Sequence, residues 1–436
     1  MFLRTLKLHN YRMFENIELE FDPKYSVIIG VNGAGKTTIL EAATIALGTL
    51  FQQLSGVNKY GFKRTDAHRK YFPAGSSTDV QPQYPVENYA EGNVDHREIK
   101  WKRTLKSETG KTTVGEAKEM TAISTEYQER LQAGDDTLTL PLLAYYGTGR
   151  LWDYHREKQN DITQYNTRTN GYIDCMDGTA NTKLMLNWFQ KMTIQKYQRL
   201  ENGLPEAPEL RAVYQAMEEC LADFTGYKDI KIQYNMDTLD LDVFYTDEDN
   251  RRIIIPLGML SDGFKEIISV VADMAYRMAI LNPHLLDQVI LETDGVVLID
   301  EIDLHLHPAW QQKIVGALTK VFPKVQFIVT THAPAVVSSV DRQHMILLKN
   351  GKVEAAPSQT HGKDVNSILE EIMGVDSRPN DFSLLFKQFY RQLNDKQYDA
   401  AQTTLDQLAK MRDYHDPEIA QCRVTLKLER IRGGQK

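Results

Sequence analysis

The glycine-rich segment GVNGAGKT, residues 30–37, matches the pattern G-x-x-x-x-G-K-[ST] at every fixed position. Glycines let such a loop wrap closely around phosphate groups, so that backbone N–H groups point at the phosphate oxygens. At this spacing Lys36 reaches the β- and γ-phosphates, and the hydroxyl of Thr37 binds Mg²⁺. The alternative is a glycine-rich turn followed by Lys-Thr by chance, which the strand before the loop and the helix after it make weak. The segment therefore predicts a nucleotide site with Mg²⁺.

Two carboxylates follow the apolar run 296–299. A strand that ends there would place Asp300 beside the metal bound by Thr37. It would also place Glu301 where its carboxylate can orient or deprotonate an attacking water. Taken alone, the pair fits an acidic strand end equally well. Together with the phosphate loop it predicts the second half of the site.

The roles of two further residues depend on where they lie relative to the phosphate loop. His332 closes the apolar run VQFIVTT and could hydrogen-bond a γ-phosphate from the tip of its strand, although such a histidine is often structural. Ser261 opens a helical pattern and is a natural N-cap. Its hydroxyl and the N–H of Gly263, at the positive end of that helix, could instead meet a phosphate held by another subunit.

The surrounding sequence predicts the strands and helices that position these residues. Apolar and polar residues alternate within residues 1–29, which predicts strands, and helical spacing follows from Lys36. Residues 99–113 predict a hairpin that turns at Gly110. Further strands are expected at 138–146, 230–245, 296–299 and 325–329, and helices at 180–224 and after Asp364.

The composition excludes several classes of protein. Of 436 residues, 42% are apolar and 25% are charged, which is typical of globular proteins and argues against a largely disordered chain. No stretch approaches the roughly 20 apolar residues of a membrane span, and no secretory signal is visible, so no membrane partner is expected. The three cysteines are too scattered for a zinc site or a disulfide framework. We therefore expect the protein in the cytoplasm, where disulfides are rare.

Contact with DNA is a weaker inference. The net charge is −8, so nucleic-acid binding would need a local basic face. Residues 59–111 hold 11 Lys and Arg against 7 Asp and Glu, and they include Trp101. A hairpin with a solvated basic face explains this segment equally well.

The four motifs are the phosphate loop, the segment at Ser261, the Asp300-Glu301 pair and His332. In this order along the chain, they resemble the ABC-type ATPase heads of the RecF/SMC/OLD group. The resemblance implies that ATP is the nucleotide and that Asp303 lies in the D-loop. The roles it implies are catalysis by Glu301, Lys36 and His332, Mg²⁺ binding by Thr37 and Asp300, and ATP binding by Arg12, Asn32, Gly33, Ala34, Gly35, Lys36, Thr37, Thr38, Ser261 and Gly263. In two places the sequence departs from that group. Asp262 stands where the signature motif usually has glycine, and residues 147–150, Gly-Thr-Gly-Arg, stand where a Q-loop glutamine is expected.

Several longer stretches, among them LLAYYGTGRLW, GVVLIDEIDLHLHPAWQQKI and QFIVTTHAPAVV, resemble the Septu anti-phage ATPase family PtuA, including its retron-linked members. That family works with a separate small HNH nuclease, PtuB. The resemblance therefore implies a PtuB-like partner, which the C-terminal helices would bind, and a homodimer or larger assembly of head-to-tail dimers.

The expected fold is α/β: an ABC-type ATPase head, with a mixed sheet and an antiparallel β subdomain, a helical lid insert and a helical C-terminal region. The expected divisions are an ATPase lobe with the phosphate loop (1–150), a lid insert and strand pair (151–255), a core with signature helix, Asp300 and His332 (256–356), and a helical docking region (357–436). Only 104 residues follow His332 and most of them are predicted helical, so no nuclease is expected in this chain.

Three functions are compatible with the predicted site and fold, to different degrees. The first is a slow, regulatory ATPase of a defence complex that controls a partner nuclease. The second is a RecF-like DNA repair ATPase without a nuclease partner, which would need a basic DNA-binding face. A transporter ATPase is the third, and the separation of 225 positions between Lys36 and Ser261 disfavours it.

Overall fold

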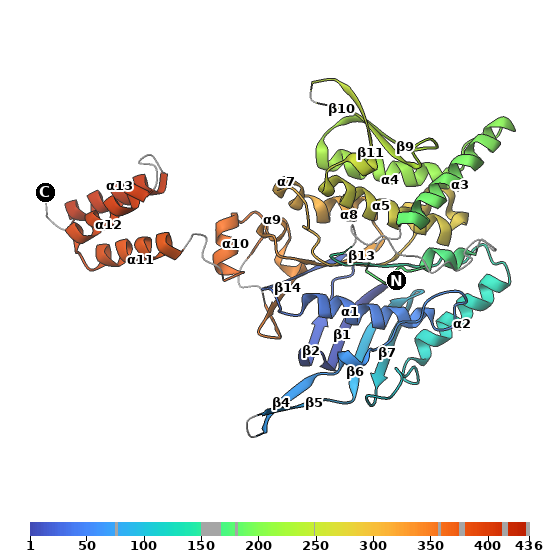
Figure 1. The fold of residues 1–436 in the computed structure, drawn as a ribbon, viewed down its shortest axis with the longest axis horizontal. Coiled ribbons are helices and arrows are strands. Elements are labelled where there is room, and N and C mark those ends of the chain that lie inside the picture. The colour runs from blue at the N-terminus through green and yellow to red at the C-terminus, as the bar shows by residue number, and fades with distance from the viewer. Residues whose placement is uncertain are drawn as a thin grey trace. The chain divides into compact units, whose positions relative to one another are not determined.

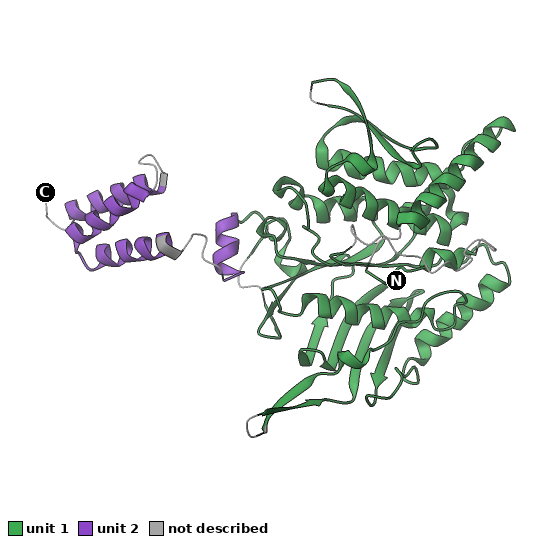
Figure 2. Cartoon of the chain, in the orientation of Figure 1, with its two compact units in different colours: residues 1–363 green, residues 364–436 purple. Residues whose placement is uncertain are grey.

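The computed structural model describes residues 1–74, 77–149, 167–178, 182–247, 249–355, 359–374, 380–411 and 417–432. Arg150, one of the departures from the Q-loop pattern, lies outside the described residues. So do residues 151–166, with which the expected lid insert begins. The described chain forms two compact units, residues 1–363 and residues 364–436 (Figure 2).

A six-stranded sheet forms the centre of the first unit (Figure 1). Its strands, in spatial order, are β15 (Lys352–Glu354), β14 (Met345–Lys349), β3 (Tyr25–Gly30), β13 (Val325–Thr331), β12 (Gly295–Ile299) and β8 (Leu142–Tyr146). All neighbours are parallel except the edge pair β14–β15. Every residue of β8, β12 and β13 is buried, as expected for parallel strands covered on both faces. Because parallel strands end at the same edge, β3, β13 and β12 deliver their C-terminal residues to one place.

A second, antiparallel sheet packs on helix α1 (Lys36–Leu47), which contacts both sheets. Its strands, in spatial order, are β2 (Phe14–Glu20), β1 (Phe2–Tyr11), β6 (Val86–Val94) and β7 (Arg97–Leu105). Two of its side chains donate to backbone carbonyls of α1: the Asn88 amide to Ala42 at 2.7 Å and the Trp101 indole to Ala46 at 2.9 Å. These bonds fix the helix that begins at the phosphate loop. Helix α2 (Lys118–Gln132) packs against β7.

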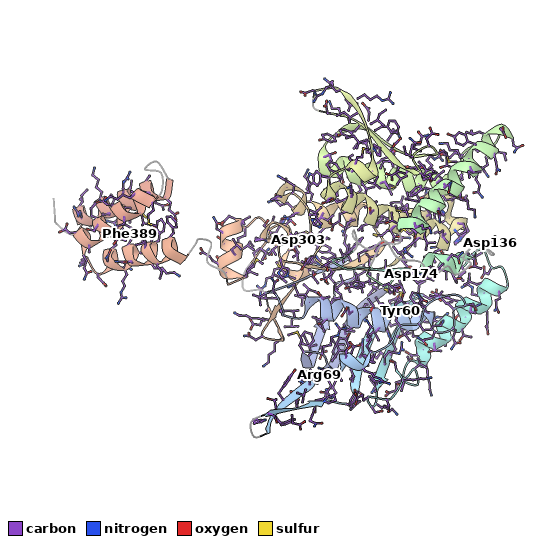
Figure 3. All side chains as sticks on the ribbon, in the orientation of Figure 1. Tyr60, Arg69, Asp136, Asp174, Asp303 and Phe389 are labelled. Atoms are coloured by element: carbon purple, nitrogen blue, oxygen red, sulfur yellow. The ribbon has the colours of Figure 1, made fainter. Side chains whose placement is uncertain are left out.

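The hairpin predicted around Gly110 forms only in part. The Gly110 N–H donates to the Ser107 carbonyl at 3.0 Å and the chain folds back on β7, but residues 111–117 form no strand. Strand β7 pairs with the preceding strand, β6, through a turn at Asp95 and His96, which both have positive φ. Beyond β7 the chain makes a single bridge, between Thr104 and Thr113. A two-stranded ribbon, β4 (Arg69–Ala74) and β5 (Ser77–Pro82), was not predicted; Figure 3 shows Arg69 at its base.

Helices α3 (Thr182–Glu201), α4 (Pro208–Thr225) and α5 (Asp262–Leu281) form a layer on the other side of the central sheet from α1 (Figure 1). The three-stranded sheet of β9 (Lys228–Asn235), β10 (Asp240–Thr246) and β11 (Arg252–Pro256) adjoins this layer. These elements include the helices expected at 180–224 and the strands expected at 230–245, with β11 as a third strand. The boundaries of the lid insert stay a prediction. The shorter helices are α6 (Val289–Glu292), α7 (Pro308–Gln311), α8 (Ile314–Val321) and α9 (Pro334–Val337). None of the helices in the described ranges is long and apolar enough to cross a membrane.

The second unit is helical, as predicted. Its helices are α10 (Val365–Glu371), α11 (Asn380–Asn394), α12 (Tyr398–Met411) and α13 (Pro417–Arg432). The last three share an apolar core in which Phe389, Leu405 and Ile419 are fully buried, and Figure 3 shows Phe389 between the helices. The mixed sheet, the antiparallel sheets and the helical C-terminal region confirm the predicted fold class.

Candidate functional site

The phosphate loop lies between β3 and α1, and its backbone requires glycine. Gly33 and Gly35 have φ of +78° and +99°, in the left-handed region that favours glycine. A Cβ on Gly35 would also lie 2.5 Å from Cζ of Phe14 and 2.5 Å from Sδ of Met13. The loop therefore turns sharply against Met13 and Phe14, and α1 begins directly after it. The first N–H groups of a helix have no partner within the helix, as a phosphate cradle needs.

Lys36 lies at the centre of the site. Its ammonium donates to the carbonyl oxygens of Gly30 at 2.9 Å and Val31 at 3.2 Å, and lies 3.5 Å from Nδ1 of His332. Burial lowers the pKa of Lys36, against the opposing effect of Asp300 and Glu301. A bound triphosphate would restore the charge that burial disfavours, so the position suits a phosphate ligand.

Thr37 and Asp300 meet across the site. The Thr37 hydroxyl donates to Oδ2 of Asp300 at 2.7 Å. Two oxygens side by side suit Mg²⁺, which is usually held by one or two protein oxygens together with substrate phosphates and water. Within the described part of the chain, no three His, Cys, Asp or Glu side chains gather as a metal site. Thr37 and Asp300 therefore suit a Mg²⁺ ion that is bound together with a nucleotide, and not a metal ion that is held by protein ligands alone.

Glu301 and His332 face each other beside Lys36. Nε2 of His332 lies 3.8 Å from Oε1 of Glu301. Burial lowers the pKa of His332 and the nearby Lys36 ammonium lowers it further, so the imidazole is neutral near pH 7. A neutral imidazole can donate one hydrogen bond and accept another. The structure thus brings together five residues singled out in the sequence: Lys36, Thr37, Asp300, Glu301 and His332.

Two threonines of β13 belong to the site and were missed from the sequence. The Thr330 hydroxyl donates to Oδ1 of Asp300 at 2.6 Å, and the Thr331 hydroxyl donates to Oδ1 of Asp303 at 2.5 Å. Both threonines are fully buried. Threonine is common in strands, so the residue type alone does not indicate a role in the site. The only signal in the sequence was the position of both threonines directly before His332. Asp303, expected in the D-loop, is thereby tied to the strand that carries the histidine.

Ser261 and Gly263 lie at the N-terminus of α5. Ser261 is the N-cap, yet its side chain makes no capping hydrogen bond to any described residue. A Cβ on Gly263 would lie 2.7 Å from the carbonyl oxygen of His305, so glycine is required where α5 approaches the segment after Asp303. Gly263 thus has a packing role within the chain, and the Ser261 hydroxyl is not used for capping. Asp262 forms a 3.7 Å ion pair with Lys265.

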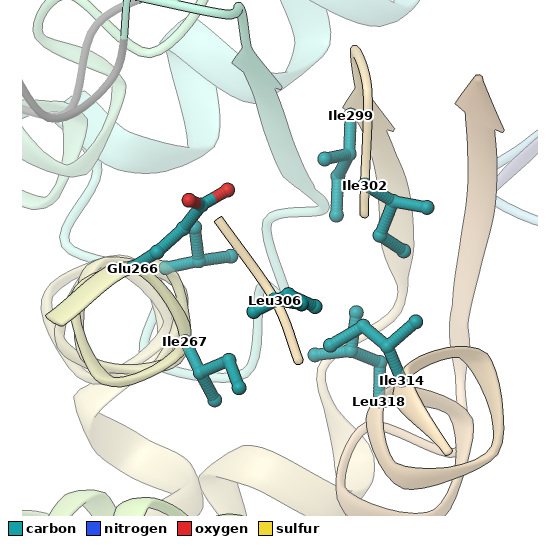
Figure 4. Close-up of a pocket in the computed structure, with 8 residues that line it drawn as sticks. Glu266, Ile267, Ile299, Ile302, Leu306, Ile314 and Leu318 are labelled. Atoms are coloured by element: carbon teal, nitrogen blue, oxygen red, sulfur yellow. The ribbon is translucent and has the colours of Figure 1, made fainter. Parts of the chain in front are cut away.

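A small cavity lies between α5, β12 and α8 (Figure 4). Its volume is about 20 Å³, room for one water at most. It is lined by Glu266, Ile267, Val270, Ile299, Ile302, Leu306, Ile314 and Leu318. This is an apolar packing seam between the signature helix and the segment after Asp300, and it is too small for a nucleotide.

Arg12 is held by carboxylates. Its Nε donates to Oδ1 of the buried Asp66 at 2.8 Å, and Nη1 pairs with Glu41 of α1. The guanidinium also lies 5.3 Å from the centroid of the Tyr11 ring. Two ion pairs therefore compete with the phosphate contact that the resemblance implies for Arg12.

Two lysines of β7, in the basic segment weighed for DNA contact, are paired with carboxylates. Lys100 pairs with Glu91 at 3.0 Å, and Lys102 pairs with Glu87 at 3.1 Å. Trp101 is 1% exposed and points into the core, so its ring is not available to stack on a base. Strand β7 therefore offers neither the free charge nor the exposed aromatic side chain that a nucleic-acid surface uses.

Comparison with known proteins agrees with this geometry. A family model described as "AAA domain" matches residues 5–224, just over half of the chain. The "Retron Vc95 probable ATPase" of Vibrio cholerae serotype O1 biovar El Tor is 27% identical over 86% of this chain and 80% of its own. The "Septu protein PtuA" of Bacillus thuringiensis is 24% identical over 86% and 84%. Among solved structures, the SMC head domain from Thermotoga maritima is 15% identical with a TM-score of 0.43, covering 82% of this chain and all of its own. Because the family model matches more than half of the chain, the chain belongs to the AAA domain family.

Proposed function

We propose that this chain is the ATP-binding and hydrolysing subunit of an anti-phage defence complex, and that it controls a separate HNH nuclease through ATP-dependent head-to-tail dimers. The observation that carries the ATPase assignment is the meeting of Lys36, Thr37 and Asp300 at one sheet edge. Its similarity to Septu PtuA and to retron ATPases supports the defence context. This last step rests on family and not on the chemistry of the site.

Each residue has a defined task in hydrolysis. Lys36 neutralises the β- and γ-phosphates, while Thr37 and Asp300 hold Mg²⁺, which supplies further charge neutralisation. The Glu301 carboxylate orients the attacking water and accepts its proton, and the neutral His332 hydrogen-bonds the γ-phosphate. Positioning and charge stabilisation then carry the reaction.

The dimer is proposed from Ser261. Its hydroxyl, free of a capping role among the described residues, stands at the positive end of the 20-residue helix α5. In a head-to-tail pair, Ser261 and the N–H of Gly263 would meet the γ-phosphate bound by the other subunit, so that each site is completed by a second copy.

Light scattering with Mg²⁺ and ATP tests this dimer. Glu301→Gln keeps the shape of the side chain but removes the base, so ATP should persist and the dimer should accumulate. The double variant Glu301→Gln, Ser261→Arg should remain monomeric, because a bulky cation then stands at the interface. An equal mass for Glu301→Gln with and without ATP would contradict the composite site.

The nuclease partner is proposed to bind the second unit. Val424, Leu428 and Ile431 of α13 are 57%, 51% and 64% exposed. Their i, i+4, i+7 spacing aligns them in one apolar stripe, away from Ile419 and the shared core. Such a stripe suits a partner helix or groove.

Co-purification from the native locus, with mass spectrometry, tests the partner. A stoichiometric small protein with an HNH-type His-Asn-His arrangement is expected, and Leu428→Glu should release it. Thr425→Glu is the control that adds the same charge away from the stripe. Recovery of the chain alone, or with recombination proteins and DNA, would overturn the nuclease proposal.

The RecF-like alternative, a DNA repair ATPase without a nuclease, requires tight DNA binding by the isolated chain with a steep salt dependence. The paired lysines of β7 and the buried Trp101 disfavour it. A gel shift at low salt distinguishes the two functions.

A further inference from the structure

Thr330 lies between the two carboxylate residues of the site and contacts both. The Glu301 N–H donates to the Thr330 hydroxyl oxygen at 2.8 Å, and the same hydroxyl donates to Oδ1 of Asp300 at 2.6 Å. The other carboxylate oxygen of Asp300 accepts from Thr37 at 2.7 Å. One hydroxyl therefore links the backbone of Glu301 to the side chain of Asp300, and through it to the phosphate loop.

The backbone at Glu301 needs such support. Its φ is +47°, which is uncommon for a residue with a side chain and is strained. The next residue, Ile302, donates its N–H to the carbonyl oxygen of Thr330 at 2.9 Å. Thr330 thus holds the peptide groups on both sides of Glu301, one through its side chain and the other through its backbone.

The burial of Thr330 argues that the hydroxyl serves the site. Thr330 is fully buried in a parallel strand whose other inner residues are mostly apolar, where valine would fill the same volume without a polar atom to satisfy. Both hydrogen bonds of the hydroxyl go to the residues that turn the chain from β12 toward the nucleotide.

We infer that Thr330 is a positioning residue for ATP hydrolysis, which rests on the proposed function. It orients Asp300 toward Mg²⁺ and holds Glu301 in the conformation that presents its carboxylate to the attacking water. The adjacent Thr331 donates to Asp303 instead, so of these two threonines only Thr330 holds Asp300.

The test compares Thr330→Val, which keeps the volume and removes the hydroxyl, with Thr330→Ser, which keeps the hydroxyl. Two properties of the full chain are measured: kcat and KM for ATP, and the gain in ATP affinity when Mg²⁺ replaces EDTA. Thr330→Val should lower kcat on the order of 10–100-fold and reduce the Mg²⁺-dependent gain in affinity, with KM changed less than about threefold. Thr330→Ser should restore both to within about threefold. Thr319→Val, which removes a hydroxyl that donates to carbonyl oxygens within α8, should leave both properties unchanged.

Two outcomes would overturn the inference: Thr330→Val with the kcat and the Mg²⁺ dependence of the natural chain, or Thr330→Ser as defective as Thr330→Val. If Thr330→Val does not fold, Thr330→Ala replaces it, because alanine and serine differ only in the hydroxyl. A natural chain without ATPase activity would contradict the proposed function, and Thr330 would then be judged by the Mg²⁺ dependence of ATP binding alone.

Discussion

The Thr37 hydroxyl donates to Oδ2 of Asp300 at 2.7 Å, although the two residues are 263 positions apart in the chain. The contact joins the first turn of α1 to the end of β12. Asp300 is 2% exposed and also accepts from Thr330, while its backbone N–H donates to the Tyr146 carbonyl at 2.8 Å. The two oxygens proposed for Mg²⁺ are therefore placed by contacts within the fold itself.

Asp300→Asn tests the metal assignment. The amide keeps the shape of the side chain but loses the charge that attracts Mg²⁺, so hydrolysis should fall by at least about 100-fold. ATP binding in EDTA should be unchanged, and Mg²⁺ should no longer tighten it. Titration calorimetry with and without Mg²⁺ measures this. An equal gain from Mg²⁺ in both proteins would remove Asp300 from the metal site.

Gly35→Ala should disrupt the phosphate loop. The new Cβ would meet the Phe14 ring at 2.5 Å, and φ of +99° strains any other residue. We expect a loss of about 2–4 kcal/mol in the free energy of unfolding, together with weaker ATP binding. Gly56→Ala is the matched control, because Gly56 has φ of +74° but no atom within 4 Å of its Cβ position. It should cost only about 1–2 kcal/mol and leave ATP binding intact. Equal losses in urea titrations would show that the contact with Phe14 does not matter.

Local signals predicted much of the fold and of the site. The phosphate loop, the apolar strands that end at Asp300 and His332, and the helices after residue 364 are each marked within about 20 residues of sequence. Parallel strand ends share an edge, so these local signals also predicted that the site residues would meet.

The predictions that were incomplete concern contacts between residues that lie far apart in the sequence. Alternation identified β7 as a strand but not its partner strand. The chain turns at Gly110 as predicted, yet the strand that pairs with β7 precedes it, across the turn at Asp95-His96. The carboxylates around Arg12 come from positions 41 and 66, which nothing near Arg12 in the sequence indicates.

The pH dependence of stability should report on His332. Burial, followed by the Lys36 charge, lowers its pKa below 6.5, the usual value, which the unfolded chain retains. Below about pH 6.5 the unfolded state therefore binds a proton that the folded state does not, so stability falls as the pH decreases toward the folded-state pKa.

His332→Gln removes this titration. The difference in free energy of unfolding between the natural chain and the variant should be constant above about pH 6.5, and should shift against the natural chain below it. Taking the difference removes the contribution of His284, whose pKa burial also lowers. A flat difference down to pH 5 would show that His332 titrates alike in both states.

A fully buried charge cluster ties the signature helix to the site. Nε of Arg277 donates to Oδ2 of Asp273 at 2.6 Å, and the Tyr146 hydroxyl donates to the same oxygen at 2.7 Å. Arg277 also donates to the carbonyl oxygens of Gly171 and Ile173. Since the Tyr146 carbonyl accepts the N–H of Asp300, α5, with Ser261 at its start, is connected to the proposed metal ligand through one residue.

Arg277→Met should cost about 3–5 kcal/mol in the free energy of unfolding, because it leaves the Asp273 carboxylate buried without its cation. Tyr146→Phe should cost only about 1–3 kcal/mol, because the ion pair survives. The control is Lys320→Met, which breaks the 2.8 Å pair with Asp223. Since the Lys320 side chain is 68% exposed, we expect a much smaller loss than for Arg277→Met. Urea unfolding measures all three. Similar losses for Arg277→Met and Lys320→Met would mean that water reaches Asp273, and α5 would then not be rigidly tied to β8.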